Sequence, residues 1–375
     1  MSLAAFASAA SMRVNDAMLP RLDAEFHVGL AQAASVITVF AVAYGVMQMA
    51  FGPLGDRFGK LRVIGLAALG AAAATLACWA APGFESFLGA RLVAGALCGA
   101  IIPLSMAWIG DVVPYETRQP VIARFLLGQI LGFGAGTAVG GLAAEHVHWR
   151  WPFAVLAAWL LVSGALLLRA SRHDPGPRVP SGGTFFRDVG KVLGARWARI
   201  VIATVSLEGM VVFGALAFVP THLHLSRGFT LSRAGFAMIT FAAGGIAFAV
   251  FARPIVRIFG EVGLAVGGSL ILAGGLALIA WTPHPAVAPL GCLLAGLGFY
   301  MLHNTLQTNA TQMSPERRGA GMALFASMFF LGQSAGVALA GIVVEAGGAA
   351  GLLFGAALAI LPIGLGFARL RQTRA

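Results

Sequence analysis

Apolar stretches separated by short polar breaks repeat from one end of this sequence to the other. Each is roughly 20 residues long, which as an α-helix is enough to cross the ~30 Å hydrocarbon core of a bilayer. Only 10% of the 375 residues are charged and 59% are hydrophobic, whereas a soluble domain carries about 25% charged residues. The sequence therefore predicts an integral membrane protein.

The stretches predict an all-α membrane protein with twelve transmembrane helices. The sequence lacks the period-two alternation of a membrane β-barrel, and glycine and alanine crowd the stretches, as close helix packing in lipid favours. The predicted spans are residues 2–20, 33–54, 61–81, 84–109, 121–143, 151–169, 197–218, 232–252, 262–281, 285–309, 319–343 and 349–369.

An internal repeat divides the chain into two parts. A shift of 200 residues superimposes identical residues of the two parts. The aligned pairs include Gly132 with Gly332, Gly136 with Gly336, Gly141 with Gly341 and Glu145 with Glu345. This repeat predicts two six-helix halves, residues 1–169 and 197–375. Residues 170–196, rich in proline, glycine and basic residues, are the predicted cytoplasmic linker.

The basic residues orient the spans. If both termini lie in the cytoplasm, the outside loops hold only Arg21, Arg150, Arg227 and Arg233, as the positive-inside rule requires. Topology and attraction to anionic lipid headgroups then account for the net charge of +11 better than nucleic-acid binding does. We expect a monomer in the bilayer of a bacterial inner (plasma) membrane, with no nucleic-acid partner.

Three motifs stand at set places among the spans. "GPLGDRFGKLR" follows the second span, "FLGAR" brings an arginine into the fourth, and "GQILGFGAGTAVGG" forms a glycine ladder in the fifth. Together with the two six-helix halves, these motifs resemble the major facilitator superfamily, and most of all its drug:proton antiporter branch. The resemblance covers nearly the whole chain and implies a secondary transporter that works by alternating access.

The glycine ladder has a physical meaning of its own. Gly132, Gly136, Gly140 and Gly141 match the antiporter motif of this span, and they allow close helix packing, which we expect to be against the other half. Thr137 stands where the family usually has proline. The helix is therefore expected to bend less, which weakens the assignment of antiport over symport or uniport.

The loop after the second span combines glycines with an acid. Gly52, Gly55 and Gly59 permit a tight turn and a close approach of helices. Asp56 is placed to face the positive N-terminus of a neighbouring helix such as the eleventh span. That contact would hold the two halves together on the cytoplasmic side.

The same loop is basic. By the resemblance, Arg57, Lys60 and Arg62 form a charge network with Asp111, at the inner end of the fourth span, and the network breaks and forms as the halves move. A basic loop that only follows the positive-inside rule is the simpler alternative.

Ionisable side chains at membrane depth are costly and mark functional sites. Glu208 lies near the middle of the seventh span, where a carboxyl group can bind and release a proton, and is the first candidate for proton coupling. A permanently neutral or hydrogen-bonded carboxyl group is the alternative. Asp16 and Arg91 have similar depths and are predicted to pair, with Arg13 competing for Asp16 at a spacing of three residues. By the resemblance, the acid and Arg91 handle protons or substrate; a static pair is the alternative.

A polar stripe marks the tenth span. Tyr300, His303, Asn304 and Gln307 fall on one helical face, which is expected to line a substrate cavity for an amphipathic organic compound. Hydrogen bonding between helices is the alternative.

Other features are assigned no chemistry. His222 and His224 are spaced like a weak metal pair but are expected in a solvated outer loop, and the three cysteines are expected to be packing residues. The sequence predicts no metal and no cofactor.

These observations favour a secondary transporter in which inward proton flow drives export of a small organic compound. A proton symporter or a uniporter that imports a sugar or an organic acid is the runner-up, and flux direction separates the two. A non-transporting receptor would need a soluble output domain larger than any loop here. An enzyme is excluded because no nucleophile-base pair, metal cluster or phosphate loop occurs.

Overall fold

The structure, a computed structural model, describes residues 1–174, 185–281 and 284–373. Within these residues the chain is almost entirely helical and has no strand. Eight of the described helices are long and apolar enough to cross a membrane, by length and composition. The all-α expectation is confirmed. Part of the predicted linker, residues 175–184, lies outside the described residues, and the short helix α9 (Phe185–Gly194) follows it.

In residues 1–174, eight helices make up six spans. α1 and α2 together form one interrupted span, and so do α5 and α6. The helices are α1 (Ser2–Arg13), α2 (Leu19–Phe26), α3 (Gly29–Phe58), α4 (Lys60–Ala80), α5 (Phe84–Cys98), α6 (Ile101–Val112), α7 (Tyr115–His146) and α8 (Trp151–Ser171).

The described residues from 196 to 373 contribute the other six spans. The helices are α10 (Arg196–Arg227), α11 (Leu231–Trp281), α12 (Ala288–Gln312) and α13 (Arg318–Gln372). α11 and α13 each supply two spans, because the chain turns back at Gly260 (φ 61°) and Gly348 (φ 79°). Only glycine adopts such a positive φ without strain. The predicted total of twelve spans is confirmed.

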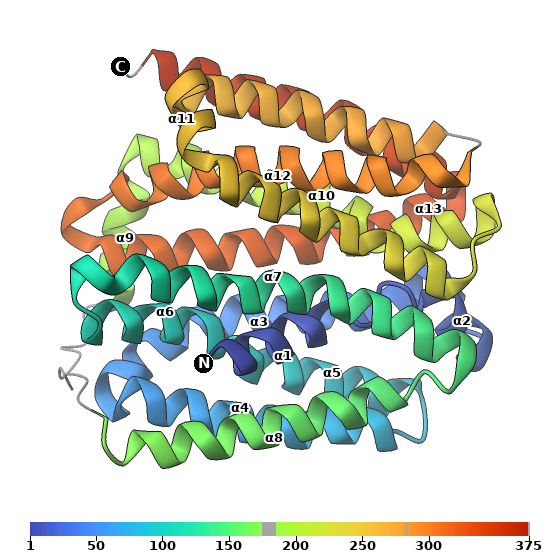
Figure 1. Cartoon of the computed structure of the whole chain (residues 1–375), viewed down its shortest axis with the longest axis horizontal. Helices are drawn as coiled ribbons and strands as arrows, with labels where there is room; N and C mark the ends of the chain where they lie inside the picture. Colours follow the sequence, from blue (N-terminus) through green and yellow to red (C-terminus); the bar gives the residue numbers. More distant parts are fainter. Residues whose placement is uncertain (175–184, 282–283, 374–375) are drawn as a thin grey trace.

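The two sets of helices lie side by side. Figure 1 shows α1 to α8 in the lower part of the view and α10 to α13 in the upper part. We call the end at which α8 ends and α10 begins the linker end, on the left of the view, and the opposite end, where α2 lies, the far end.

The first span is not the continuous helix over residues 2–20 that the sequence predicts. α1 ends at Arg13, and the chain passes through a tight turn before α2 begins at Leu19. In this turn the N–H groups of Asp16 and Met18 donate to carbonyl groups three residues back, at 3.1 and 2.9 Å. Pro20 contributes to the break because it has no N–H to continue an α-helix.

Glycines on α7 and α13 create the same packing twice. A Cβ atom at Gly132 or Gly136 would overlap the carbonyl oxygen of Phe6 or Ala10 in α1. The equivalent glycines of α13, at positions 332 and 336, meet the carbonyl oxygens of residues 206 and 210 in α10. The expectation that the ladder packs against the other half is therefore wrong for Gly132, Gly136 and also Gly140, which meets Val14. Gly141 alone of these four packs across the boundary, against Leu231 of α11.

Gly136→Val is expected to lower the free energy of unfolding by about 1–3 kcal/mol. The new side chain would strike the backbone of Ala10, which cannot move aside as a flexible side chain can. Gly274→Val is the matched control, since nothing lies within 4 Å of a Cβ at that helical position. Equilibrium unfolding in mixed detergent micelles measures both, and equal losses would contradict the packing role.

His222 and His224, which were expected in an outer loop, lie on the helix α10. α10 ends only at Arg227. Gly228 follows it in the left-handed conformation, which commonly ends a helix. His222 is buried, and its Nε2 lies 3.2 Å from the carbonyl oxygen of Ile279. The assignment of His222 to a solvated loop was wrong because the helix is longer than its most apolar part.

Candidate functional site

Glu208 is completely buried on α10. Its Oε2 lies 2.7 Å from Nδ1 of His303, which projects from α12, and its Oε1 has no hydrogen-bond partner in the part of the chain that the structure describes. The His303 ring packs against Phe299 and Phe329, with centroids 5.1 and 4.8 Å away. Glu208 and His303 thus form a pair of proton-binding groups in an otherwise apolar setting.

A second buried pair lies at the break in the first span. Nη2 of Arg13 is 2.7 Å from Oδ2 of Asp16, both side chains are fully buried, and the contact lacks the angles of a hydrogen bond. The Arg13 guanidinium group lies over the rings of Phe133 and Phe213, 4.6 and 5.2 Å from their centroids. Phe133 belongs to α7 and Phe213 to α10, so Arg13 contacts both sets of helices.

An aromatic cluster joins the two pairs. Phe213 is edge-on to Phe299 and Phe329, at 5.2 and 5.3 Å between centroids, and these two rings pack on His303. Phe133 stacks on Phe241 of α11 at 5.5 Å. The cluster is apolar, and the rings of Phe133 and Phe213 already hold the guanidinium cation of Arg13, which is the kind of contact an organic cation makes.

Arg91 is not the partner of Asp16. It is buried, and its Nη1 donates to the carbonyl oxygen of Ser11 at 2.9 Å while its guanidinium group lies 4.2 Å from the ring centroid of Phe40. The sequence prediction of an Asp16–Arg91 pair gives way to the competing Arg13–Asp16 pair, because the tight turn after α1 brings Asp16 back to Arg13. Arg91 ties α5 to the backbone of α1.

The polar stripe of α12 divides along its length. His303 reaches Glu208, and the Tyr300 ring packs against Gly245 of α11. Asn304 is half-buried and Gln307 is exposed. The stripe therefore runs from the aromatic cluster toward the linker end.

At the linker end, Lys60 joins two acids. Its Nζ lies 2.7 Å from Asp56 and 2.8 Å from Asp111 of α6. Arg57 instead lies over the ring of Phe58 at 5.1 Å, and Arg62 lines a groove between α4 and α8. Among the described residues Asp56 forms its ion pair with Lys60 and accepts no hydrogen bond from the start of α13.

The glycines of this loop differ in their surroundings. A Cβ at Gly55 would meet Leu104 of α6 at 2.6 Å, whereas nothing lies within 4 Å of one at Gly52. Gly59 has a φ of 91° where α3 passes into α4. Gly59 is thus required by the turn, whereas a side chain at position 55 would have to displace the end of the Leu104 side chain.

A matching network that was not expected from the sequence lies in the other half. Oε2 of Glu261 accepts a hydrogen bond from Nδ2 of Asn309 at 3.0 Å and from Nε of Arg371 at 2.8 Å. Glu261 follows the Gly260 turn just as Lys60 follows the Gly59 turn. The repeat relates Glu261 to Lys60 and could have indicated this network. The two positions carry opposite charges, so the relation was not recognised.

Two carboxylates connect the halves at the far end. The backbone N–H of Ser232, at the start of α11, donates to Oε2 of Glu145 on α7 at 2.7 Å. The N–H of Ala31, at the start of α3, donates to Oε1 of Glu345 on α13 at 2.9 Å. Each carboxylate thus caps the positive end of a helix in the other half.

Glu145→Gln with Glu345→Gln is expected to favour opening of the far end by roughly 5- to 30-fold in population, because glutamine can still accept the hydrogen bond but loses a charge–dipole interaction of about 0.5–1 kcal/mol at each cap. Distances between spin labels placed on the two halves at that end measure the shift. Glu85→Gln, an exposed far-end carboxylate on α5, is the control. An unchanged distance distribution in the double variant would contradict the role of the caps.

Comparisons with known proteins are consistent with this architecture. A family model described as Major Facilitator Superfamily matches residues 1–337. The chain is 24% identical to the MFS-type transporter paaT of Penicillium rubens over 75% of this chain and 60% of paaT. It is 28% identical to the multidrug efflux pump LfrA of Mycolicibacterium smegmatis over 44% of this chain and 33% of LfrA. The chain thus spans less than two thirds of either relative.

A solved structure shares the fold. The nucleoside transporter NupG superimposes with a TM-score of 0.79 over 98% of this chain and 96% of that one, at 16% sequence identity. At this identity the likeness shows the arrangement of the helices alone.

Proposed function

Because this chain belongs to the major facilitator superfamily, a family of membrane transporters rather than enzymes, we propose that it exports a small organic compound in exchange for protons by alternating access. The observation that carries the proposal is the buried Glu208–His303 pair, 2.7 Å apart and packed on an aromatic cluster that both halves build. A carboxyl group in such a place can take up a proton on one side and release it on the other.

The aromatic cluster is the proposed substrate surface. Phe133, Phe213 and Phe299 lie in ring contact between the Arg13–Asp16 pair and His303. Such a surface suits an amphipathic compound with an aromatic or cationic part. The name of LfrA, a multidrug efflux pump, agrees with this choice of substrate class and with export.

The proposed cycle moves the two halves, residues 1–169 and 197–375, about this surface. The caps made by Glu145 and Glu345 close the far end, while at the linker end no atom of the described residues lies within 4 Å of a Cβ at Gly52. We assign this arrangement to the inward-facing state. In the outward-facing state Asp56 would meet the start of α13 and the far-end caps would open.

The proposed orientation places both termini and the linker end in the cytoplasm of a bacterial cell, in its inner membrane. The linker end carries Arg57, Lys60 and Arg62, and α8 ends with Arg169. This excess of basic residues is what the positive-inside rule describes. Cysteine labelling of both ends in intact cells tests the orientation. We further propose that the transporter acts as a monomer.

Transport in proteoliposomes with a trapped pH dye tests the function. Lipophilic cations, sugars and organic acids are added in turn, and proton movement is followed together with flux of each compound. Proton release from the lumen on entry of a lipophilic cation supports antiport. Co-movement of proton and compound in one direction would make the chain a symporter, and flux without proton movement would make it a uniporter.

A further inference from the structure

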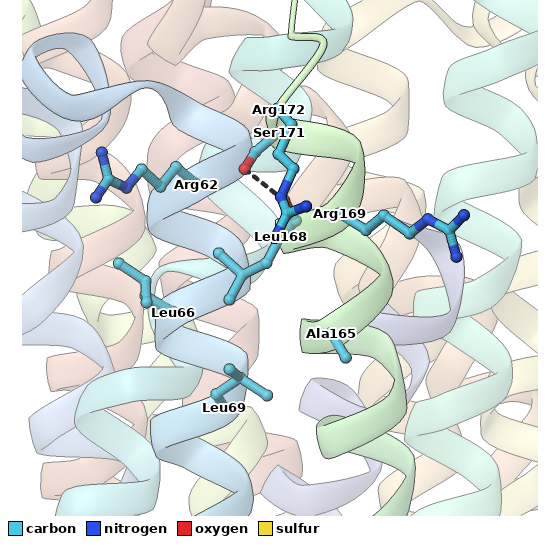
Figure 2. A pocket seen from close by; sticks show the side chains of 8 residues that line it. All are labelled: Arg62, Leu66, Leu69, Ala165, Leu168, Arg169, Ser171 and Arg172. Atoms are coloured by element: carbon cyan, nitrogen blue, oxygen red, sulfur yellow. Dashed lines mark hydrogen bonds between the residues drawn. The ribbon is translucent and has the colours of Figure 1, made fainter.

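A groove of about 910 Å³ lies between α4 and α8 at the linker end (Figure 2). Its lining residues are Arg62, Leu66, Leu69, Ala165, Leu168, Arg169, Ser171 and Arg172. Figure 2 shows Leu69 and Leu168 in the space between the two helices, with Arg172 and Ser171 beyond them and Arg62 and Arg169 extended to either side. The groove thus has an apolar part and a basic rim.

Close packing of the two helices builds the apolar part. A Cβ at Gly65 of α4 would lie 2.8 Å from Cγ of Leu168, and one at Gly164 of α8 would lie 2.9 Å from Cδ2 of Leu69. The leucines therefore lie against the neighbouring backbone and form a fixed floor. Leu66 is 52% exposed at the edge.

The rim carries positive charge that no carboxylate of the described residues neutralises. Among the described residues, no carboxylate lies within ion-pair distance of Arg62, Arg169 or Arg172, whereas Arg150, Arg317 and other arginines have such partners. Three unpaired guanidinium groups at one end of a leucine-lined groove favour an anion that has an apolar tail.

A second, smaller groove of about 400 Å³ continues on the other side of α4. It shares Arg62 and Leu66 with the first and is otherwise lined by apolar side chains such as Leu54 and Phe58. Both faces of α4 near Arg62 therefore offer apolar surface, which suits a molecule with two hydrocarbon chains and one headgroup.

The groove is separate from the proposed transport site. Both of its walls belong to the first half of the bundle, so movement of one half against the other leaves its shape unchanged. A site for a transported compound must instead change its exposure between the two sides.

We propose that this groove binds an anionic phospholipid, with the phosphate facing Arg172 at the end of the groove, the positive charges of Arg62 and Arg169 on either side, and the upper acyl chains against Leu66, Leu69 and Leu168. The binding site follows from membrane insertion of the chain and does not depend on which compound is transported. It is an annular position at which a lipid with a negative headgroup exchanges more slowly than its zwitterionic neighbours.

Native mass spectrometry of the purified full chain, titrated with phosphatidylglycerol or phosphatidylcholine in detergent, tests the proposal. Replacement of the three arginines together (Arg62→Gln, Arg169→Gln and Arg172→Gln) is expected to weaken phosphatidylglycerol binding on the order of 100-fold. The matched control (Arg187→Gln, Arg196→Gln and Arg199→Gln) removes the same charge from exposed positions at the same end. It is expected to bind like the wild type.

Three outcomes would overturn the proposal. Equal loss in both triple variants would mean that only total charge matters, and equal binding of the two lipids by the wild type would mean that the anionic headgroup is not selected. Competition by inorganic phosphate at millimolar concentration would mean that the phosphate is recognised without its acyl chains. If the triple variant does not fold, Arg172→Gln alone provides the same comparison, with a correspondingly smaller expected loss.

Discussion

Glu208→Gln is expected to abolish substrate-driven proton movement in proteoliposomes, down to the level of protein-free vesicles. Glutamine keeps the size of the side chain and can still hydrogen-bond to His303, 2.7 Å away, but it cannot bind and release a proton at membrane depth. Exchange of labelled for unlabelled substrate needs no proton and is expected to continue. The measurement follows the trapped pH dye and the labelled compound in the same vesicles.

Glu316→Gln is the control for this result. It removes the same group from the same half, but its side chain is 82% exposed and pairs with neighbouring Arg317. Proton movement should persist in this variant. Wild-type proton movement in Glu208→Gln would show that the buried carboxyl group is structural and would transfer the coupling role to another residue.

Asp16→Asn is expected to lower the free energy of unfolding by about 3–5 kcal/mol. The change leaves the Arg13 charge buried beside Phe133 and Phe213 without its counter-ion. Equilibrium unfolding in mixed detergent micelles measures the loss. The double variant Arg13→Gln with Asp16→Asn should regain much of the stability, because neither charge then remains.

A partly exposed ion pair provides a reference for that experiment. Glu25 lies 3.3 Å from Arg150, and both side chains are about a quarter exposed. Glu25→Gln should therefore cost no more than about 1 kcal/mol. If Asp16→Asn cost as little as Glu25→Gln, the buried pair would not contribute to stability as burial and distance imply.

The fold was predictable because each span has its own signal in the sequence. Apolar length located the spans, and the 200-residue repeat placed Gly136 and Gly336 in equivalent positions. What failed were details that depend on neighbours. The break after Arg13 is hidden within an apolar stretch, and three glycines of the α7 ladder pack on α1 of the same half rather than across the boundary.

The site was only partly accessible to sequence reasoning. Glu208 and His303 could each be selected as polar residues in apolar spans, yet their contact depends on how α10 and α12 pack. Phe133 and Phe213 carried no signal, because 26 phenylalanines are spread along the chain and nothing local distinguishes these two. The sequence offers both Arg13 and Arg91 as partners of Asp16, and only the geometry of the turn selects Arg13.

The crossed caps at the far end have the geometry of an internal homodimer. Glu145 reaches the start of α11 while Glu345 reaches the start of α3, and Gly141 and Gly341 pack on the same two helices. This is an isologous contact, the kind that two copies of one six-helix unit form around a twofold axis. Joining the copies in one chain makes their association intramolecular. The two halves can then separate at the far end and close again while the chain keeps them joined.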